Sequence, residues 1–280
     1  MSHPTDNVEY PATSTKLQDI AAQLVAARRQ ARPLNGFPGT APGDLDLAYQ
    51  VQDKAIDLWT DRAIGGWKVG RIPPDLEDGF GIDRLAGPIF ADTIVHVDSG
   101  TSVDMPIIDG GFAAIEAEFV AVIDRDAPAH KLTWSRDEAL DMIADLRIGL
   151  EIASSPLSNI NDLGPAVVVS DHGNNLGLVV GPTIENWRTR PLDSMRCTAI
   201  VGLEEVGAGG AFTLSGGFIR SVQFLLELGA RRNRPLRAGD LIATGQTTGI
   251  HDVVAGQMAT TDFGDDGKLT VRLIAATPAK

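Results

Sequence analysis

The sequence IEAEFVAVI, residues 115–123, decides how the rest of the chain is organised. Its nine residues are rich in β-branched and aromatic side chains and include no glycine or proline, which predicts a strand. Side chains alternate between the two faces of a strand, so Glu116 and Glu118 share one face. Val120 and Val122 continue that same face, which therefore has the composition of a buried surface.

Two carboxylates on one buried face require compensation. Their Cα atoms are about 6–7 Å apart on a strand. Buried like charges are costly unless they are protonated, paired or bound to a cation. A divalent cation that prefers oxygen ligands, such as Mg²⁺, would meet this requirement. The alternative is an edge strand whose glutamates reach water, and exposed glutamates are the commoner situation.

A third carboxylate, Glu151, lies in the apolar run LRIGLEIA, residues 146–153. It could pair with Arg147, or it could join Glu116 and Glu118 in a three-carboxylate site for Mg²⁺ or Mn²⁺. The five histidines show no metal-binding spacing and Cys197 is the one thiol, so zinc and copper have little support.

Lys68 lies in the glycine-flanked segment GGWKVG, residues 65–70, which predicts a short strand. The side chains of Trp67 and Val69 face away from it. A lysine that points toward a metal site could bind an anionic substrate or relay a proton. The alternative is a surface lysine whose ammonium group reaches solvent.

Two polar loops are further candidates for a site. The segment GDLIATGQTTG, residues 239–249, predicts a strand followed by a loop that offers hydroxyl, amide and backbone N–H groups to a carboxylate. The segment DHGNN, residues 171–175, follows an apolar run at 166–170. Both segments are also compatible with ordinary turns. No phosphate-binding glycine motif and no GxSxG nucleophile motif is found in the sequence.

The charge balance limits the kinds of partner. The 280 residues include 24 basic and 37 acidic side chains, which gives a formal net charge of −13. This speaks against nucleic acid or an anionic membrane as a partner and leaves a small-molecule substrate. The single cysteine, the polar N-terminus and the lack of a long apolar run predict a cytoplasmic protein.

The pattern of predicted elements indicates an α+β fold. A loose tail is expected over residues 1–13, followed by helices at 14–33 and 44–62, so residues 1–65 form a helical N-terminal segment. Residues 66–280 would form a metal-binding catalytic domain with a mixed, rolled sheet, because its strands lack regular helical crossovers. Helices are also expected at 135–146, where Ser135 and Glu138 make a capping box, and at 217–228. The expected strands are 67–70, 88–90, 94–98, 112–123, 148–153, 166–170, 176–181, 196–202, 241–244 and 269–275.

Six motifs in fixed order resemble the fumarylacetoacetate hydrolase superfamily. They are GWKVG at 66–70, GID at 81–83, IEAEF at 115–119, LEIA at 150–153, VSD at 169–171 and GDLIATG at 239–245. Within the superfamily the chain is most similar to the branch of 2-hydroxypenta-2,4-dienoate (2-oxopent-4-enoate) hydratases and 4-oxalocrotonate decarboxylases. The resemblance covers about residues 14–275.

The resemblance implies a fold, a cofactor and site residues. The fold is a mixed β-roll with flanking helices, assembled as a homo-oligomer, and the cofactor is Mg²⁺ or Mn²⁺. The implied roles are metal ligands for Glu116, Glu118 and Glu151, catalytic roles for Lys68 and Asp83, and substrate binding for Asp171, Gln246 and Thr247.

The implied reaction is hydration of a 2-hydroxydienoate or 2-oxoenoate in aromatic meta-cleavage catabolism, through a metal-chelated enolate. Decarboxylation of a 2-oxo-diacid such as 4-oxalocrotonate needs the same metal core and stays open. An acylpyruvate C–C hydrolase needs a histidine–glutamate pair, for which only His96 precedes Glu116 at a suitable place. A non-catalytic partner subunit is disfavoured because a scaffold has no reason to concentrate buried acids. The segment SSPL, residues 154–157, lacks the arginine found in the SRI-like element of the hydratases.

Overall fold

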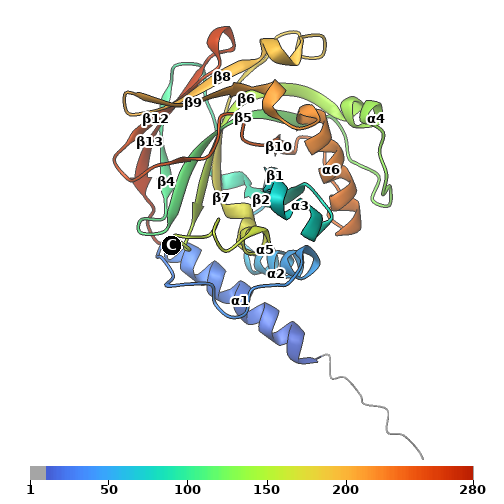
Figure 1. Cartoon of the computed structure of the whole chain (residues 1–280), viewed down its shortest axis with the longest axis vertical. Helices are drawn as coiled ribbons and strands as arrows, with labels where there is room; N and C mark the ends of the chain where they lie inside the picture. The colour runs from blue at the N-terminus through green and yellow to red at the C-terminus, as the bar shows by residue number, and fades with distance from the viewer. Residues whose placement is uncertain (1–10, 280) are drawn as a thin grey trace, which may run out of the picture.

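The structure is a computed structural model that describes residues 11–279. Its centre is a large, strongly curved mixed sheet, which Figure 1 shows in the upper part of the molecule. Hydrogen bonding joins β1 to β10 and β3 to β7 in parallel, whereas the β5–β6 and β6–β7 pairs are antiparallel. The spatial order of the strands is β2 (Arg84–Phe90), β1 (Ile64–Arg71), β10 (Leu241–Ala243), β5 (Phe112–Ile123), β6 (Ile143–Ser155), β7 (Asn175–Thr183) and β3 (Ile94–His96), with β11 (His251–Asp252) paired to β5.

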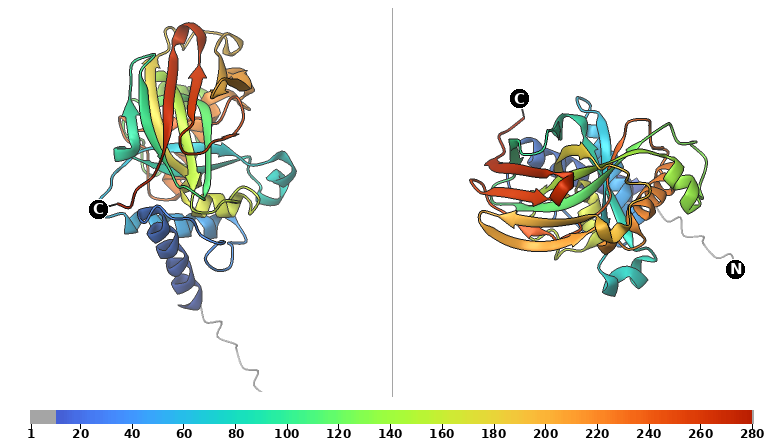
Figure 2. Two further views of the ribbon diagram at one scale, coloured as in Figure 1. Left: turned by 90° about the vertical axis from the view of Figure 1, so that its left-hand side faces the viewer. Right: turned by 90° about the horizontal axis from the view of Figure 1, so that it is seen from above.

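A smaller sheet covers one face of the large one, as the two views of Figure 2 show. Side chains from both sheets join in one main hydrophobic core. The two mixed sheets confirm the predicted α+β class and the rolled arrangement. The strands of the smaller sheet, in order, are β4 (Ser102–Ile107), β13 (Lys268–Ala275), β12 (Met258–Asp262), β8 (Arg196–Val201) and β9 (Glu204–Gly210).

Six α-helices border the sheets in the described chain. At one end of the molecule α1 packs on α2, and α2 packs on α5, through a second hydrophobic cluster (Figure 1). No helix within residues 11–279 is both long and apolar enough to span a membrane. The helices are α1 (Pro11–Arg29), α2 (Leu45–Leu58), α3 (Pro74–Phe80), α4 (Arg136–Asp141), α5 (Pro165–Ser170) and α6 (Gly217–Arg231). Single 3-10 turns are η1 (Ala91–Thr93), η2 (His172–Asn174), η3 (Leu192–Ser194), η4 (Ala211–Thr213) and η5 (Gly264–Asp266).

The strand β5 has the two faces that its sequence predicts. One face belongs to the main core, where Ile115 and Phe119 are fully buried. Val120, on the other face, joins a small separate cluster with Ile89, Leu178, Val180, Leu241 and Ala243. The glutamates of β5 therefore lie on a buried, concave surface of the large sheet.

The predicted strand at 166–170 is wrong, because the structure has the helix α5 there. The three consecutive valines favour a strand. However, Gly164 adopts a positive φ of 93° and Pro165 occupies the first helical turn, a position that suits proline. Contacts of α5 with α2 then bury Val167 and stabilise the helix. Here tertiary packing overrides intrinsic β-propensity.

The predicted helix at 135–146 is only half right. Its capping box is present, with the Ser135 hydroxyl and the Glu138 carboxylate each accepting a backbone N–H of the other residue. The helix α4 ends at Asp141, and Ile143 already begins the strand β6. The apolar residues that continue the helical spacing belong to β6 and pair with β5.

Other boundaries differ by a few residues. The helix α1 begins at Pro11 rather than Ser14, and residues 1–10 of the expected tail lie outside the described chain. The strand β2 begins at Arg84 rather than Pro88. The sequence prediction missed α3 and the strands β4, β9, β11 and β12, which contain many polar, acidic or glycine residues.

Gly87 in β2 packs closely against the main chain of His172, and its substitution tests how tightly this part of the interior is packed. A Cβ atom at Gly87 would lie 1.9 Å from the carbonyl oxygen of His172, so one backbone must move. We expect Gly87→Ala to lower the free energy of unfolding by about 3 kcal/mol, the cost of overpacking a tight interior. Urea unfolding measures this change. Gly43→Ala is the control because no atom lies within 4 Å of its new Cβ, and equal midpoints for the two variants would contradict the prediction.

Candidate metal centre and active site

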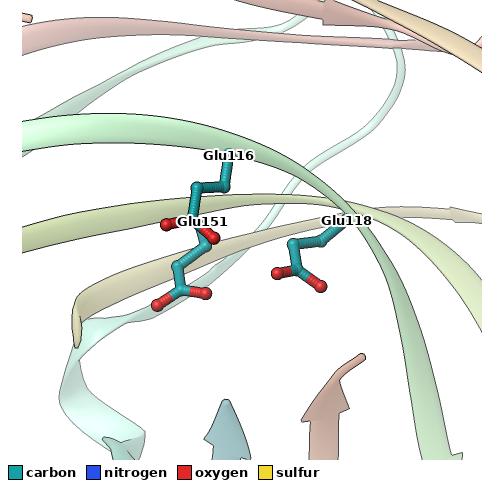
Figure 3. Close-up of side chains that lie close together, drawn as sticks. All are labelled: Glu116, Glu118 and Glu151. Atoms are coloured by element: carbon teal, nitrogen blue, oxygen red, sulfur yellow. The ribbon is translucent and has the colours of Figure 1, made fainter. Parts of the chain in front are cut away.

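Three glutamates converge on the concave face of the large sheet (Figure 3). Glu116 lies directly opposite Glu151 in the antiparallel β5–β6 pair, and Glu118 is the next residue on the same face. One carboxylate oxygen from each glutamate lies within 4.8 Å of the other two. All three side chains are at most 2% exposed. Like charges opposite one another in a sheet are destabilising, so this arrangement calls for compensation by an opposite charge, a bound proton or a bound cation.

The donor atoms of this cluster fit a hard divalent cation. Glu118 Oε1 and Glu151 Oε2 are buried and have no hydrogen-bond partner. Buried carboxylate oxygens normally have partners, and these two point into a group of three oxygen donors. Oxygen ligands of this kind suit Mg²⁺, Mn²⁺ or Ca²⁺. The remaining oxygens are held in place, since the Gly245 N–H donates to Glu118 Oε2 at 2.6 Å and the Asn175 amide donates to Glu151 Oε1 at 2.9 Å.

Lys68 is the only cationic side chain of the described chain that pairs with this cluster. Its Nζ lies 3.4 Å from Glu151 Oε1, and its side chain is 4% exposed. Trp67 and Val69 point into the main core, as their alternation with Lys68 predicts. Burial acts to lower the pKa of Lys68, but the charges of Glu151, Glu116 and Glu118 outweigh burial and raise it. Lys68 is therefore positively charged, and it neutralises one of three acids.

The carboxyl groups themselves bind protons more tightly than usual. Burial, with Lys68 opposing it and Glu151 adding to it, raises the pKa of Glu116 to about 7. Burial and the charges of Glu151 and Glu116 raise the pKa of Glu118 well above its ordinary value. Without a second cation, protons thus take the place of a metal ion in part of the cluster.

The loop after β10 is fastened to β5 by two hydroxyls. Thr244 Oγ1 donates to the carbonyl of Phe119 and Thr247 Oγ1 donates to the carbonyl of Ala117, both at 2.7 Å. Gly245 between them adopts a φ of +124°, which directs its N–H toward Glu118. This loop therefore positions one carboxylate of the cluster.

A cavity of about 190 Å³ leads to the cluster and is lined by Glu116 and Lys68. Its other polar walls come from Arg71, Asn161, Asn174 and Gln246. The rest of the wall is mainly apolar and comprises Pro73, Leu76, Leu85, Pro165, Val168 and Ile250. The volume and the mixture of charged, amide and apolar side chains in the wall suit a small organic acid.

The five other predicted site residues differ in their surroundings, and only two of them line this cavity. Lys68 and Gln246 line the cavity. The Asp83 carboxylate, about one-third exposed, pairs with the neighbouring Arg84 and does not line the cavity. The Thr247 hydroxyl is used in docking its loop. Both carboxylate oxygens of Asp171 are bonded within the protein.

Sequence reasoning missed two residues that support the cluster. Asn175 donates to Glu151, and Arg28 on α1 donates to the main chain of Asn175 and to the side chain of Asp171. Asn175 is the last residue of the polar segment 171–175, which the sequence did mark as a candidate for a site. No local signal marked Arg28, because it is one of two adjacent arginines in the last turn of a helix, where basic residues are common.

The fold and the acidic cluster define a rolled-sheet protein with three buried carboxylates that could together hold a metal ion. The family model described as fumarylacetoacetate (FAA) hydrolase C-terminal matches residues 88–276, and the chain belongs to this family. The predicted resemblance is thereby confirmed. Arg28 and Lys68 precede the matched segment.

Similar proteins cover nearly the whole chain. A 2-keto-4-pentenoate hydratase from Burkholderia vietnamiensis (strain G4 / LMG 22486) is 25% identical over 232 residues, which is 82% of this chain and 86% of the relative. Two solved structures of 4-oxalocrotonate decarboxylase from Pseudomonas putida G7 share the fold at 20% identity, covering 96% of this chain and all of theirs. The complex with calcium and acetate has a TM-score of 0.76, and the complex with magnesium and adipate has one of 0.75.

The raised pKa of Glu116 predicts a pH dependence of metal binding. A bound cation must displace the proton, so the affinity for Mn²⁺ should rise by about tenfold between pH 6 and pH 8 if one group with a pKa of about 7 titrates. Titration calorimetry of the metal-stripped protein measures this. The metal-free protein should also lose stability as the pH rises from about 4.5 to about 7, because the folded state holds this proton more tightly than the unfolded state. An Mn²⁺ affinity that stays constant between pH 6 and pH 8 would contradict the prediction that Glu116 is a metal ligand.

Proposed function

We propose that the protein is a divalent-metal-dependent hydratase, a lyase that adds water to a 2-hydroxydienoate or 2-oxoenoate. The observation that carries this proposal is the group of three buried carboxylates with unpartnered oxygens beside a buried lysine at the end of one small cavity. The similarity to a 2-keto-4-pentenoate hydratase over most of both chains supports the same reaction. A place in aromatic catabolism follows from this substrate class.

In this proposal Glu116, Glu118 and Glu151 would hold Mg²⁺ or Mn²⁺. When bound, such a cation would supply coordination positions for the carboxylate and the 2-oxygen of a 2-oxo acid and would polarise that oxygen. The Lys68 ammonium, 3.4 Å from Glu151, is placed to bind the anionic end of the substrate or to donate a proton. The amide of Gln246 offers a further hydrogen bond from the cavity wall.

The remaining predicted roles are also proposals. Asp83 would act indirectly, through its pair with the neighbouring Arg84. Thr247 and Asp171 would contribute to substrate binding indirectly, because hydrogen bonds within the protein occupy the Thr247 hydroxyl and both Asp171 oxygens.

Decarboxylation of a 2-oxo-diacid is the second candidate reaction. The observation in its favour is Arg71 in the cavity wall, whose guanidinium contacts Glu77 at 3.3 Å and is half exposed. A second carboxylate on the substrate could take the place of Glu77 as its partner. In contrast, the cavity lining includes no histidine among residues 11–279, and His96 is exposed on β3, so no observation favours the hydrolase reaction.

One experiment separates these reactions. The metal-stripped protein is incubated with 2-hydroxypenta-2,4-dienoate or with 4-oxalocrotonate, with Mg²⁺, with Mn²⁺ or with EDTA. Loss of the dienol absorbance without CO₂ release is expected for the first substrate, and only when metal is present. CO₂ release from the second would instead support the decarboxylase. Equal rates with metal and with EDTA would refute the metal-dependent mechanism for both.

We further propose that the protein forms a homo-oligomer in the cytoplasm. Large apolar side chains are exposed on and near the smaller sheet, including Leu203 in the β8–β9 turn and Phe212 in η4. Such side chains are often covered in an assembly. Light scattering on the purified protein would give the mass, and a monomer at micromolar concentration would refute this part of the proposal.

A further inference from the structure

We infer that Arg28, on the N-terminal helix α1, is a positioning residue for the metal ligand Glu151 and acts on it through Asn175. The inference rests on the proposed metal centre. It assigns a role in that centre to the helical segment that precedes the matched family domain.

The guanidinium of Arg28 is buried and makes contacts to three segments. It pairs with both oxygens of Asp171, with Nε–Oδ1 at 2.6 Å and Nη2–Oδ2 at 2.9 Å, and the two side chains are 5% and 0% exposed. Nη1 donates to the carbonyl of Asn175 at 2.9 Å, and Nη2 donates to the carbonyl of Ser154 at 3.1 Å. Ser155 adds a hydroxyl bond to Asp171 at 2.6 Å. A single side chain thus joins α1, the end of β6 and the start of β7.

The contact to Asn175 connects this buried pair to the metal centre. Asn175 is the first residue of β7, and its amide donates to Glu151 Oε1 at 2.9 Å. Lys68 contacts the same oxygen. Glu151 Oε2 is therefore the oxygen left without a hydrogen-bond partner and available to a cation. The main-chain carbonyl of Asn175 is held by Arg28, so the position of its side-chain amide depends on Arg28.

Positioning of Asn175, and through it of Glu151, requires the shape of an arginine side chain as well as its charge. The planar guanidinium satisfies two carboxylate oxygens and the carbonyls of Ser154, Asp171 and Asn175 at once, whereas a lysine provides a single point charge. Loss of a residue that orients a metal ligand typically weakens metal binding by about 10–100-fold. A residue with a merely structural role in α1 would lower stability without changing the intrinsic affinity of the folded protein for metal.

A double-mutant cycle on Mn²⁺ affinity tests the connection. The full-length, metal-stripped protein is titrated with Mn²⁺ by calorimetry, as wild type, Arg28→Lys, Asn175→Ala and the double variant. Each single substitution is expected to raise Kd by about tenfold. If Arg28 acts through Asn175, the double variant should also show an increase of about tenfold rather than about 100-fold, because the second substitution removes nothing further.

The controls separate positioning from folding. Arg28→Lys retains a positive charge beside Asp171, so it should fold, and thermal unfolding is recorded for every variant. Arg29→Met alters the next residue of α1, whose guanidinium pairs with Asp61 at the surface, and it should leave Kd unchanged. Wild-type Kd in Arg28→Lys, or independent effects that multiply in the double variant, would overturn the inference.

The same titration distinguishes this inference from the proposed function. A wild-type protein that binds no Mn²⁺ would overturn the metal centre together with the role of Arg28. A protein that binds Mn²⁺, shows the expected cycle and lacks hydratase activity would refute the proposed reaction and still support the positioning role.

Discussion

Glu116→Gln is expected to reduce turnover by at least about 1,000-fold at saturating substrate, because loss of a transition-state contact of about 4 kcal/mol has this effect. The substitution keeps the size of the side chain and removes one of three charged oxygen donors. Its Mn²⁺ affinity should fall by about 100-fold or more, in line with the loss of a direct ligand rather than a supporting residue.

The same variant should be more stable than wild type in the absence of metal. Burial and neighbouring charge raise the pKa of Glu116 to about 7, so its ionisation costs stability at pH 8. Removing that cost should raise the free energy of unfolding by about 1–3 kcal/mol, since each pKa unit corresponds to about 1.4 kcal/mol. Metal titration, turnover and urea unfolding measure the three effects. Glu185→Gln, at an exposed position, is the matched control, and wild-type turnover in Glu116→Gln would exclude Glu116 as a ligand.

Lys68→Met is expected to separate metal binding from turnover. The variant keeps all three carboxylates, so it should still bind Mn²⁺ at pH 8. Turnover should fall by about 100- to 10,000-fold, the range for loss of a positioned acid or base. In the metal-free form, loss of the one cation that neutralises the carboxylates should cost about 3–5 kcal/mol at pH 8.

The pH dependence of that stability loss has a definite sign. Without Lys68 the carboxyl groups bind protons still more tightly, so the loss should disappear as the pH falls through their raised pKa values. Mn²⁺ should restore stability at pH 8. Thermal unfolding at pH 5 and pH 8, with and without Mn²⁺, measures both effects. Lys54→Met on α2 is the control, and unchanged turnover in Lys68→Met would refute a catalytic role.

The sequence predicted the parts of the site that depend on short-range alternation. Period-two spacing placed Glu116 and Glu118 on one face of β5, and the same rule turned Lys68 away from its apolar neighbours. Burial of Glu151 followed from the apolar residues on either side of it. The shared location of these four residues came from the resemblance, because strand order is a long-range property.

The wrong strand prediction at 166–170 and the surroundings of two predicted site residues depend on contacts distant in sequence. The valines at 167–169 form a helix because α2 packs on them, and nothing within the segment specifies that contact. Asp171 and Thr247 are polar residues near the site, but their partners, Arg28 and the carbonyl of Ala117, lie far away along the chain. A local sequence pattern can therefore identify polar residues near a site. It does not distinguish residues that face a ligand from residues whose hydrogen bonds are made within the protein.

The parallel pairing of β1 with β10 has a consequence for biosynthesis. Lys68 is aligned with Ala243, and the loop that fixes Glu118 follows immediately. During translation at about 5–20 residues per second, the first of these strands must wait on the order of ten seconds or more for the second. The nascent chain thus exposes an unpaired edge, a target for chaperones, until nearly all of it has left the ribosome. The bond from the Gly245 N–H to Glu118 can therefore form only late in synthesis, long after all three glutamates have been translated.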